Sequence, residues 1–520
     1  MTLLPLLDNS LFLRNWRERM RPTLILSSTI ITSIVIVFFF LAAYIQHDLY
    51  KSISPPLIIF WYMILGHGVL LLLIGTSMVG HMSVQERISG TLDFHRASPT
   101  SRWNQILGIL VGAPVLEWCI FSVTLPISLV LASISEIGLI NAIVFYISLI
   151  LCAIFFHFFS LFGALHSDRK IVATQNRTGI LKIFLFLYFF PLFFVSFHFS
   201  SLYHLTCLPQ YIHVTGLIFK TLGSSLDKFY TSPALPFRLY SVQLPSLLFQ
   251  GIVEIPFIIF FSLGVMRKIS RPERPIFSKK QSLVLIGLIL FLFVGSAIPL
   301  FEYAEKKISP DAHFLTVCFV YLTTFLGILG ATSITPSQLL YLKGLRKLKK
   351  LGQKKILWQD DHATNSPWLF GFALIALLFH FLFTAWMTPN LLDRFLVFSL
   401  TILYVFSLAW ALEYFRLSQH HTKRSLFIVL TSIVWFFIPL LGLIMQPLFK
   451  QYPDVIYYFF APSPLFGLGS TISIILSKSY YQNIFEPMVL VVTVLINLII
   501  ALICLLFTKR ERKFLRQKVF

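Results

Sequence analysis

Residues 23–44 read TLILSSTIITSIVIVFFFLAAY, a continuous stretch without a charged side chain. A helix rises about 1.5 Å per residue, so about 20 apolar residues cross the roughly 30 Å hydrocarbon core of a bilayer. The strands of a membrane barrel would alternate apolar and polar residues, and the run 34–43 does not. The stretch therefore predicts a membrane-spanning helix.

The composition extends this prediction to the whole chain. Of its 520 residues, 57% are hydrophobic, only 12% are charged, and 55 are Phe. A soluble domain is about 45–50% apolar and about 25% charged. So few charged side chains cannot cover a water-soluble protein of this length, which excludes a soluble enzyme, a disordered tail and a fibrous repeat.

Eleven further runs are long and apolar enough to span a bilayer. They are residues 57–79, 106–133, 139–165, 180–199, 244–266, 283–300, 313–334, 368–386, 395–415, 425–446 and 486–507. Six of the twelve runs precede the charged segment 267–282, and six follow it. The sequence therefore predicts an all-α polytopic membrane protein with about 12 transmembrane helices in two six-helix halves.

The positive charges predict how the chain is oriented. Counting alternate connections from the N-terminus, 33 of the 42 Lys and Arg residues fall on one side and 9 on the other. Because basic residues gather on the cytoplasmic side, both termini are expected in the cytoplasm and the protein in the plasma membrane, as a bacterial inner-membrane protein. The net charge of +21 is then explained by the basic residues of the cytoplasmic loops, and no nucleic acid is expected as a partner.

The leader before the first span has helical periodicity. Phe12, Trp16 and Met20 recur at four-residue spacing, and Asp8-Asn9-Ser10 before them offers helix N-caps. This pattern predicts an amphipathic helix in the membrane interface, with its arginines toward anionic lipid or a cytoplasmic partner. A solvated basic leader is the alternative.

The two halves repeat one order of spans and loops, with a long outer loop before each last span. Such internal duplication is common in transporters. The expected parts are a cytoplasmic connecting helix at 1–22, a first six-span half at 23–266, a cytoplasmic linker at 267–282, a second six-span half at 283–508 and a basic cytoplasmic tail at 509–520.

The loop after the second span carries the most specific motif in the chain. Residues 83–102 read SVQERISGTLDFHRASPTSR, and Gly108 follows. This stretch resembles the E-R-x-x-G-T-L followed by [ST]-P-x-S-R and Gly of ABC-2 type permeases, the membrane subunits of one class of ATP-binding-cassette transporter. The leader also looks like their connecting helix. The whole chain resembles two such permease halves fused.

In that family the loop forms a coupling helix in a groove of the ATPase. The resemblance implies that the following residues face an ABC ATPase (nucleotide-binding) subunit: Glu86, Arg87, Gly90, Thr91, Asp93, Arg96, Ser98, Pro99 and Arg102. A solvated loop that only follows the positive-inside bias is the alternative. No cofactor is then expected on this chain, since ATP and Mg would bind the partner ATPase.

The second half matches this pattern less well. Thr335 and Pro336 begin a candidate second coupling loop that continues through Lys343 and Gly344. The Glu-Arg and Gly-Thr-Leu portions are missing there, and residues 343–355 hold seven basic side chains instead. The second contact with an ATPase is therefore expected to differ from the first, if both exist.

Several absences and lone polar groups limit the chemistry. No Gly-Lys dipeptide occurs, so the chain has no G-x-x-x-x-G-K-[ST] phosphate loop. Glu117 and Glu254 lie about halfway along expected spans, where a carboxyl either lines a translocation path or is held by an interhelical hydrogen bond. Lone histidines among packed spans (His67, His157 and His380) are expected to be hydrogen-bonded core residues.

The cluster Asp360-Asp361-His362, with His420-His421 in the next inner loop, is the one candidate for catalysis or a divalent metal. No spacing places these residues on one helix face, so neither a catalytic nor a metal site is predicted. The five cysteines form no C-x-x-C motif. The sequence favours a permease that exports an unknown substrate by the ATP hydrolysis of a separate subunit. The alternatives are a membrane lipid or glycan transferase and, third, a secondary transporter.

Overall fold

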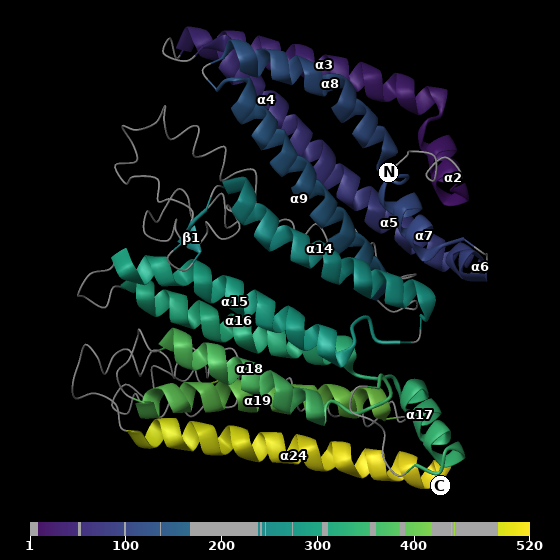
Figure 1. Ribbon diagram of the computed structural model, residues 1–520, viewed down its shortest axis with the longest axis vertical. Coiled ribbons are helices and arrows are strands. Elements are labelled where there is room, and N and C mark those ends of the chain that lie inside the picture. Colours follow the sequence, from purple (N-terminus) through teal and green to yellow (C-terminus); the bar gives the residue numbers. More distant parts are fainter. Residues whose placement is uncertain are drawn as a thin grey trace. The chain divides into compact units, whose positions relative to one another are not determined.

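The computed structural model describes most of the expected spans of this chain (Figure 1). Two of them, 180–199 and 425–446, lie outside the described residues except for positions 438 and 441. The described residues are 9–49, 54–97, 100–135, 137–166, 238–239, 242–244, 246–272, 274–303, 310–353, 360–384, 391–418, 438, 441 and 487–520.

The chain forms two compact units, Met1–Pro272 and Glu273–Phe520. The boundary between them falls inside the charged segment 267–282. Within the described residues, the first unit contains α2 (Ser10–Arg19), α3 (Pro22–Leu49), α4 (Pro55–Gly68), the π-helix η1 (Val69–Gly75), α5 (Thr76–Ile88), α6 (Thr91–Ala97), α7 (Arg102–Leu110), α8 (Val115–Ile134), α9 (Leu139–His166), the antiparallel pair β1 (Arg238–Leu239) and β2 (Val242–Gln243), and α14 (Ser246–Ser270).

The second unit is described as helices only. They are α15 (Lys279–Tyr303), α16 (Pro310–Ile334), α17 (Gln338–Lys350), α18 (Ser366–Thr384), α19 (Leu391–Leu417) and α24 (Pro487–Val519). Figure 1 shows α15, α16, α18, α19 and α24 running side by side as a bundle, with the shorter α17 at one end.

Seven helices among the described residues are long and apolar enough to cross a membrane. They are Pro22–Ile45, Pro55–Ile88, Val115–Ile134, Leu139–Leu165, Ser366–Phe383, Arg394–Leu417 and Val491–Val519. An eighth span results if the bent pair Phe319–Ile334 and Gln338–Lys350, which meet at 59°, is counted as one. The chain is thus an all-α, multi-pass membrane protein, and the count of twelve stays a prediction.

The expected third span, 106–133, is not one helix. It is divided into α7 and α8 by a turn that ends at Pro114. Proline has no amide hydrogen, so it cannot continue the hydrogen-bond ladder of α7 back to Leu110. A new helix begins at Val115, and Glu117 therefore lies in its first turn rather than halfway along a span.

The core of the first unit lies between α4, η1, α8 and α9. Phe60, Leu71, Phe121 and Phe156 are among its buried side chains. His157 on α9 lies 3.2 Å from the carbonyl oxygen of Leu71, inside η1, and thereby satisfies a backbone group at the irregular turn.

The core of the second unit is aromatic. Trp368 stacks on Phe372, and Phe319 stacks on Phe383 with ring centroids 4.5 Å apart. Gly330 on α16 leaves the space for Trp368, because a Cβ there would lie 2.5 Å from the indole ring. Close helix packing at small residues is the usual way membrane helices associate.

Candidate functional site

The loop that carries the permease-like motif folds into a short helix, α6. Gly90 has a φ of 77°, a left-handed conformation that favours glycine and ends α5. The amide hydrogens of Asp93 and Phe94 then bond to the carbonyl oxygen of Gly90 at 3.0 and 3.2 Å, which starts the next helix. The hydroxyls of Ser89 and Thr91 bond across this turn at 2.6 Å.

The two faces of α6 differ in exposure. Leu92 and His95 are buried, so they fix the helix to the rest of the unit. Asp93 is exposed and Phe94 is 71% exposed, while Ile88, just before the turn, is 56% exposed. Burial, and secondarily the charge of Arg14, lower the pKa of His95. A lowered pKa keeps this imidazole neutral on the inner face.

Two arginines of the loop bind the ends of other helices. The Nη1 of Arg87 donates to the carbonyl oxygen of Ala164, in the last turn of α9, at 2.6 Å. The Nε of Arg96 donates to the carbonyl oxygen of Ile269 at 2.7 Å, and its Nη2 reaches that of Lys268 at 3.2 Å. Both cations thus satisfy carbonyls at helix C-termini, where the helix dipole favours positive charge.

Glu86, the first residue of the motif, is only 3% exposed. It forms an ion pair with Arg14 of the connecting helix α2. A carboxylate buried this deeply needs such a partner, because an unpaired charge away from water is costly. Glu86 therefore lies between α5 and α2 instead of on the outer face of the loop.

The connecting helix α2 is stabilised by its N-cap and by hydrogen bonds to α7. The Oδ1 of Asn9 accepts from the amides of Leu11 and Phe12 at 3.1 and 3.3 Å, an N-cap of the kind predicted from the sequence. Its Nδ2 donates to the carbonyl oxygen of Asn104 on α7. The Nδ2 of Asn15 donates to the carbonyl oxygen of Gly108 at 3.2 Å.

Gly108, at the end of the motif, allows α2 and α7 to approach. A Cβ added at this position would lie 2.8 Å from the Cβ of Leu11 and 2.9 Å from the Oδ1 of Asn9. Such distances are shorter than real Cβ contacts, so a larger residue would push α2 away. The glycine that completes the motif is therefore explained by helix packing inside the first unit.

The remaining polar residues of the loop hold α7 against α6. Ser101 caps α7 by accepting from the amide of Asn104 at 3.2 Å. The buried Gln105 donates from Nε2 to the carbonyl oxygen of His95 at 2.7 Å. Arg102 is exposed. Ser98 and Pro99 lie outside the described residues.

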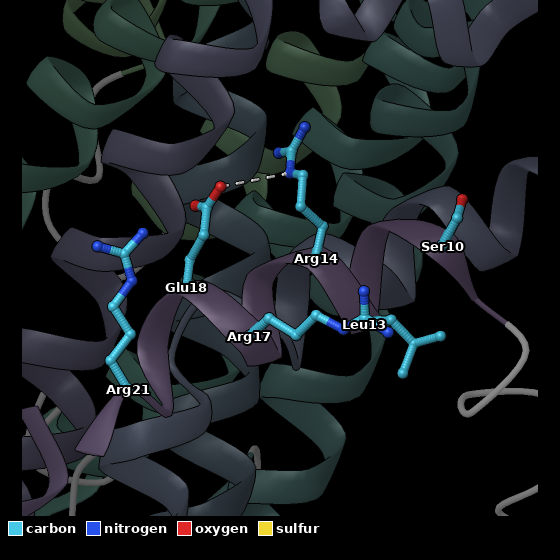
Figure 2. A pocket seen from close by; sticks show the side chains of 6 residues that line it. All are labelled: Ser10, Leu13, Arg14, Arg17, Glu18 and Arg21. Atoms are coloured by element: carbon cyan, nitrogen blue, oxygen red, sulfur yellow. Dashed lines mark ion pairs between the residues drawn. The ribbon is translucent and has the colours of Figure 1, made fainter.

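A hollow of about 350 Å³ lies along α2. Figure 2 shows the side chains that line it. Its wall is formed by Ser10, Leu13, Arg14, Arg17, Glu18 and Arg21. The Nε of Arg14 lies 3.9 Å from the Oε1 of Glu18, the pair joined in the figure. Arg14 is also paired with Glu86, so Arg17 and Arg21 carry the excess positive charge of this hollow. This charge suits an anionic group at the membrane surface, in line with the interfacial helix predicted for the leader.

Glu117 is paired with a residue that the sequence did not connect to it. The carboxylate forms an ion pair with Arg19 of α2 and is 3% exposed. The sequence pattern could not show this partner, because Arg19 lies outside the span that contains Glu117. The pair joins α2 to the first turn of α8. Its place in a translocation path stays a prediction.

Glu254 lies in α14, against α9. It is fully buried near Cys152 of α9 and Gln250 of its own helix, and neither of its carboxylate oxygens has a hydrogen-bond partner within the described residues. One turn before it, the Nε2 of Gln250 donates to the carbonyl oxygen of Ser148 at 2.9 Å. These contacts join two helices through polar groups inside the unit, as interhelical hydrogen bonds do in membrane proteins.

The three deep histidines also bond inside their own units. His67 lies 3.0 Å from the hydroxyl of Tyr146 and 2.7 Å from that of Thr124. His157 contacts the carbonyl oxygen of Leu71, and the Nε2 of His380 lies 3.1 Å from that of Arg394. The expectation that they are hydrogen-bonded core residues is confirmed.

The candidate second coupling loop forms α17. Thr335 and Pro336 are buried, and the carbonyl oxygen of Thr335 accepts from Arg416 at 2.6 Å. Gly344 is buried on the inner face of α17, whereas Lys343 is exposed. No equivalent of the α5–α6 turn precedes this helix, which instead begins at the cap Ser337. The two loops therefore differ in structure as they do in sequence.

The segment 360–362 makes structural contacts in the second unit. Asp361 pairs with Arg274 at 3.5 Å, and His362 lies 2.9 Å from the carbonyl oxygen of Leu340. Lys279 donates to the carbonyl oxygens of Asp360 and Ala363 at 3.0 and 2.8 Å. Among the described residues, no group of three His, Cys, Asp or Glu side chains could hold a metal ion. His420 and His421 lie outside them.

The fold and these contacts define the class of this chain, a multi-pass helical membrane protein whose loop motif is tied into its helix bundle. No protein-family model, curated protein or solved structure matches the chain. Its function is therefore inferred from the loop itself.

Proposed function

We propose that this chain is the permease subunit of an ATP-binding-cassette transporter that exports its substrate, with ATP hydrolysed by a separate subunit. The observation that carries the proposal is that α6 has an exposed outer face and is also hydrogen-bonded to the end of α14. The outer face of α6 carries the exposed Phe94 and the ion pair between Asp93 and Arg96, and Arg96 also donates to the carbonyl oxygens at the end of α14.

These attachments suit the transmission of movement. A partner that shifts α6 also shifts α5, which is the last part of the candidate span Pro55–Ile88. Arg87 carries the shift to α9, Arg96 carries it to α14, and the Glu86–Arg14 pair carries it to the connecting helix. In this proposal Glu86, Arg87 and Arg96 are positioning residues, and the exposed side chains make the contact.

The chemistry of the outer face fits a reversible protein contact. Large apolar side chains at the centre of an interface supply most of its affinity, and polar neighbours give specificity. Phe94, with Ile88 beside the turn, supplies the apolar part, and Asp93 the polar part. The cargo would cross through the membrane part of the protein, and its identity is open.

The test begins with a search for an ABC ATPase gene next to the gene for this chain, continues with co-purification of the full chain and that ATPase, and ends with measurement of ATP turnover. We expect wild-type protein to bind the ATPase and Phe94→Ala to weaken binding at least about tenfold, the loss typical of a central apolar contact. Phe520→Ala is the matched control, since Phe520 is also exposed (55%) but lies at the end of α24.

A second variant separates contact from transmission. Arg87→Gln removes the bond to the carbonyl oxygen of Ala164 and leaves the side chains of the outer face of α6 in place, so it should still bind the ATPase, while ATP turnover loses its response to the permease. Equal binding by wild type and Phe94→Glu, or failure of the wild-type chain to bind the ATPase at all, would contradict the proposal.

A further inference from the structure

The second unit carries a concentrated positive surface that the proposed coupling function does not use. It consists of the exposed bases of α17 and of the last turns of α24, here termed the α17/α24 basic surface. Its members are Lys343, Arg346, Lys347, Lys349, Lys350, Lys509, Arg510, Lys513, Arg516 and Lys518.

The two helices that carry these bases are packed together. Tyr341, Leu345 and Leu348 on the inner face of α17 form one apolar cluster with Leu417 and Leu515. Lys349 also donates to the carbonyl oxygen of Val519 at 2.8 Å. Figure 1 shows α17 beside the C-terminal end of α24. The two basic segments therefore belong to one surface.

No exposed acidic side chain balances this charge within the two segments. The helix α17 contains no acidic residue, and Glu511, the one acidic residue of α24, is 7% exposed. Protein interfaces are depleted in lysine and usually pair both signs of charge. A surface rich in lysine and without acids fits a dense array of anionic groups better than an ATPase groove.

The position of the surface selects the kind of anion. Lys509 directly follows the apolar stretch of the candidate span that begins at Val491. At the other helix, three residues separate the end of α16 from the start of α17, which is bent from α16 by 59°. Both basic segments therefore begin where the chain leaves the apolar core, at the level of the lipid headgroups.

We propose that the α17/α24 basic surface binds anionic phospholipid headgroups of the adjacent leaflet. Clusters of four to eight bases directly beside a membrane span attract anionic lipid, at about 1 kcal/mol for each base near the surface, or roughly fivefold in affinity. The exposed Leu339 and Leu351 near the ends of α17 add apolar side chains that can enter the interface.

The proposal is tested with the purified full chain in detergent, by titrating dioleoylphosphatidylglycerol or dioleoylphosphatidylcholine and following the midpoint of thermal unfolding. We expect half-saturation at a lower concentration of the anionic lipid, and a weaker effect at high salt because salt screens exposed charges. The double variants Arg346→Gln/Lys347→Gln and Lys509→Gln/Arg510→Gln should each bind the anionic lipid about 25-fold less tightly, the product of two fivefold losses.

The matched control is Arg102→Gln/Arg271→Gln, which removes two exposed arginines outside the surface. It should keep the anionic preference. The substituted bases are exposed, so the midpoint without added lipid should stay unchanged and report intact folding. Equal stabilisation by both lipids, or an undiminished preference in both double variants, would overturn the proposal. So would loss of ATPase binding by these variants with lipid binding intact.

Discussion

Arg14 of the connecting helix α2 and Glu86 at the end of α5 form an ion pair that holds the leader against the motif loop. Glu86 is 3% exposed, whereas the side chain of Arg14 is 37% exposed. The carboxylate is thus the buried partner, and removal of the arginine would leave it without its counter-charge.

We expect Arg14→Ala to lower the free energy of unfolding by about 1–3 kcal/mol. The upper limit is below the value for a fully buried pair because Arg14 reaches solvent. Thermal unfolding in detergent measures the loss. Arg17→Ala is the control, since Arg17 is exposed on the same helix. Similar losses in both variants would mean that the pair does not attach α2.

Gly108 tests the packing of α2 on α7. Gly108→Ala places a Cβ 2.8 Å from that of Leu11, and we expect a net loss of about 1–2 kcal/mol from overpacking, larger for Gly108→Val. Gly163→Ala is the matched control, because Gly163 also lies in a helix but has no atom within 4 Å of an added Cβ. An unchanged unfolding midpoint in Gly108→Val would show that α2 does not rest on α7.

Arg512 and Glu413 attach the end of α24 to α19. The Nε and Nη2 of Arg512 lie 2.9 and 2.6 Å from the two carboxylate oxygens of Glu413, which is fully buried. We expect Arg512→Ala to cost about 3–5 kcal/mol of stability, because it leaves a buried carboxylate unpaired.

Arg512→Lys separates charge from geometry at the same pair. Lysine keeps the charge but cannot form the two parallel bonds, so a smaller but measurable loss is expected. The exposed Arg510→Lys should leave the midpoint of thermal unfolding unchanged. If Arg512→Lys unfolds like wild type, the two-point geometry does not matter.

Lys279 should make stability depend on pH. Burial lowers the pKa of Lys279 from 10.5 to about 8, and the nearby carboxylates of Glu413, Asp361 and Asp360 oppose this shift only in part. Below pH 8 both folded and unfolded chains hold the proton. Between pH 8 and 10.5 only the unfolded chain holds it, so the free energy of unfolding rises with pH across this interval.

The expected gain from this group is roughly 3 kcal/mol, from about 1.4 kcal/mol for each pKa unit. The comparison is between wild type and Lys279→Gln, whose amide can still donate to the carbonyl oxygens of Asp360 and Ala363. The difference between their unfolding midpoints should change from pH 8 to pH 10.5 in favour of wild type. Parallel curves would show that Lys279 does not titrate in this range.

Local signals in the sequence predicted local structure well. An N-cap was expected among Asp8, Asn9 and Ser10, and Asn9 caps the leader helix. The turn at Gly90 has the backbone conformation that glycine permits. The run 106–133 was wrongly predicted to be one helix. Its apolar composition does not reveal the break before Pro114, which interrupts the backbone hydrogen bonds. Hydrophobicity alone does not show where the hydrogen-bond ladder stops.

The sequence by itself determined that this is a helical membrane protein, since the length of an apolar run is a property of consecutive residues and of the bilayer. It also singled out the loop 83–102. Only the tertiary structure decided that Glu86 forms an ion pair with Arg14 and Glu117 with Arg19. It also decided that Arg96 donates to a carbonyl oxygen at the end of α14. Each of these contacts joins residues from different helices, so their pairing depends on how those helices pack rather than on their order in the chain.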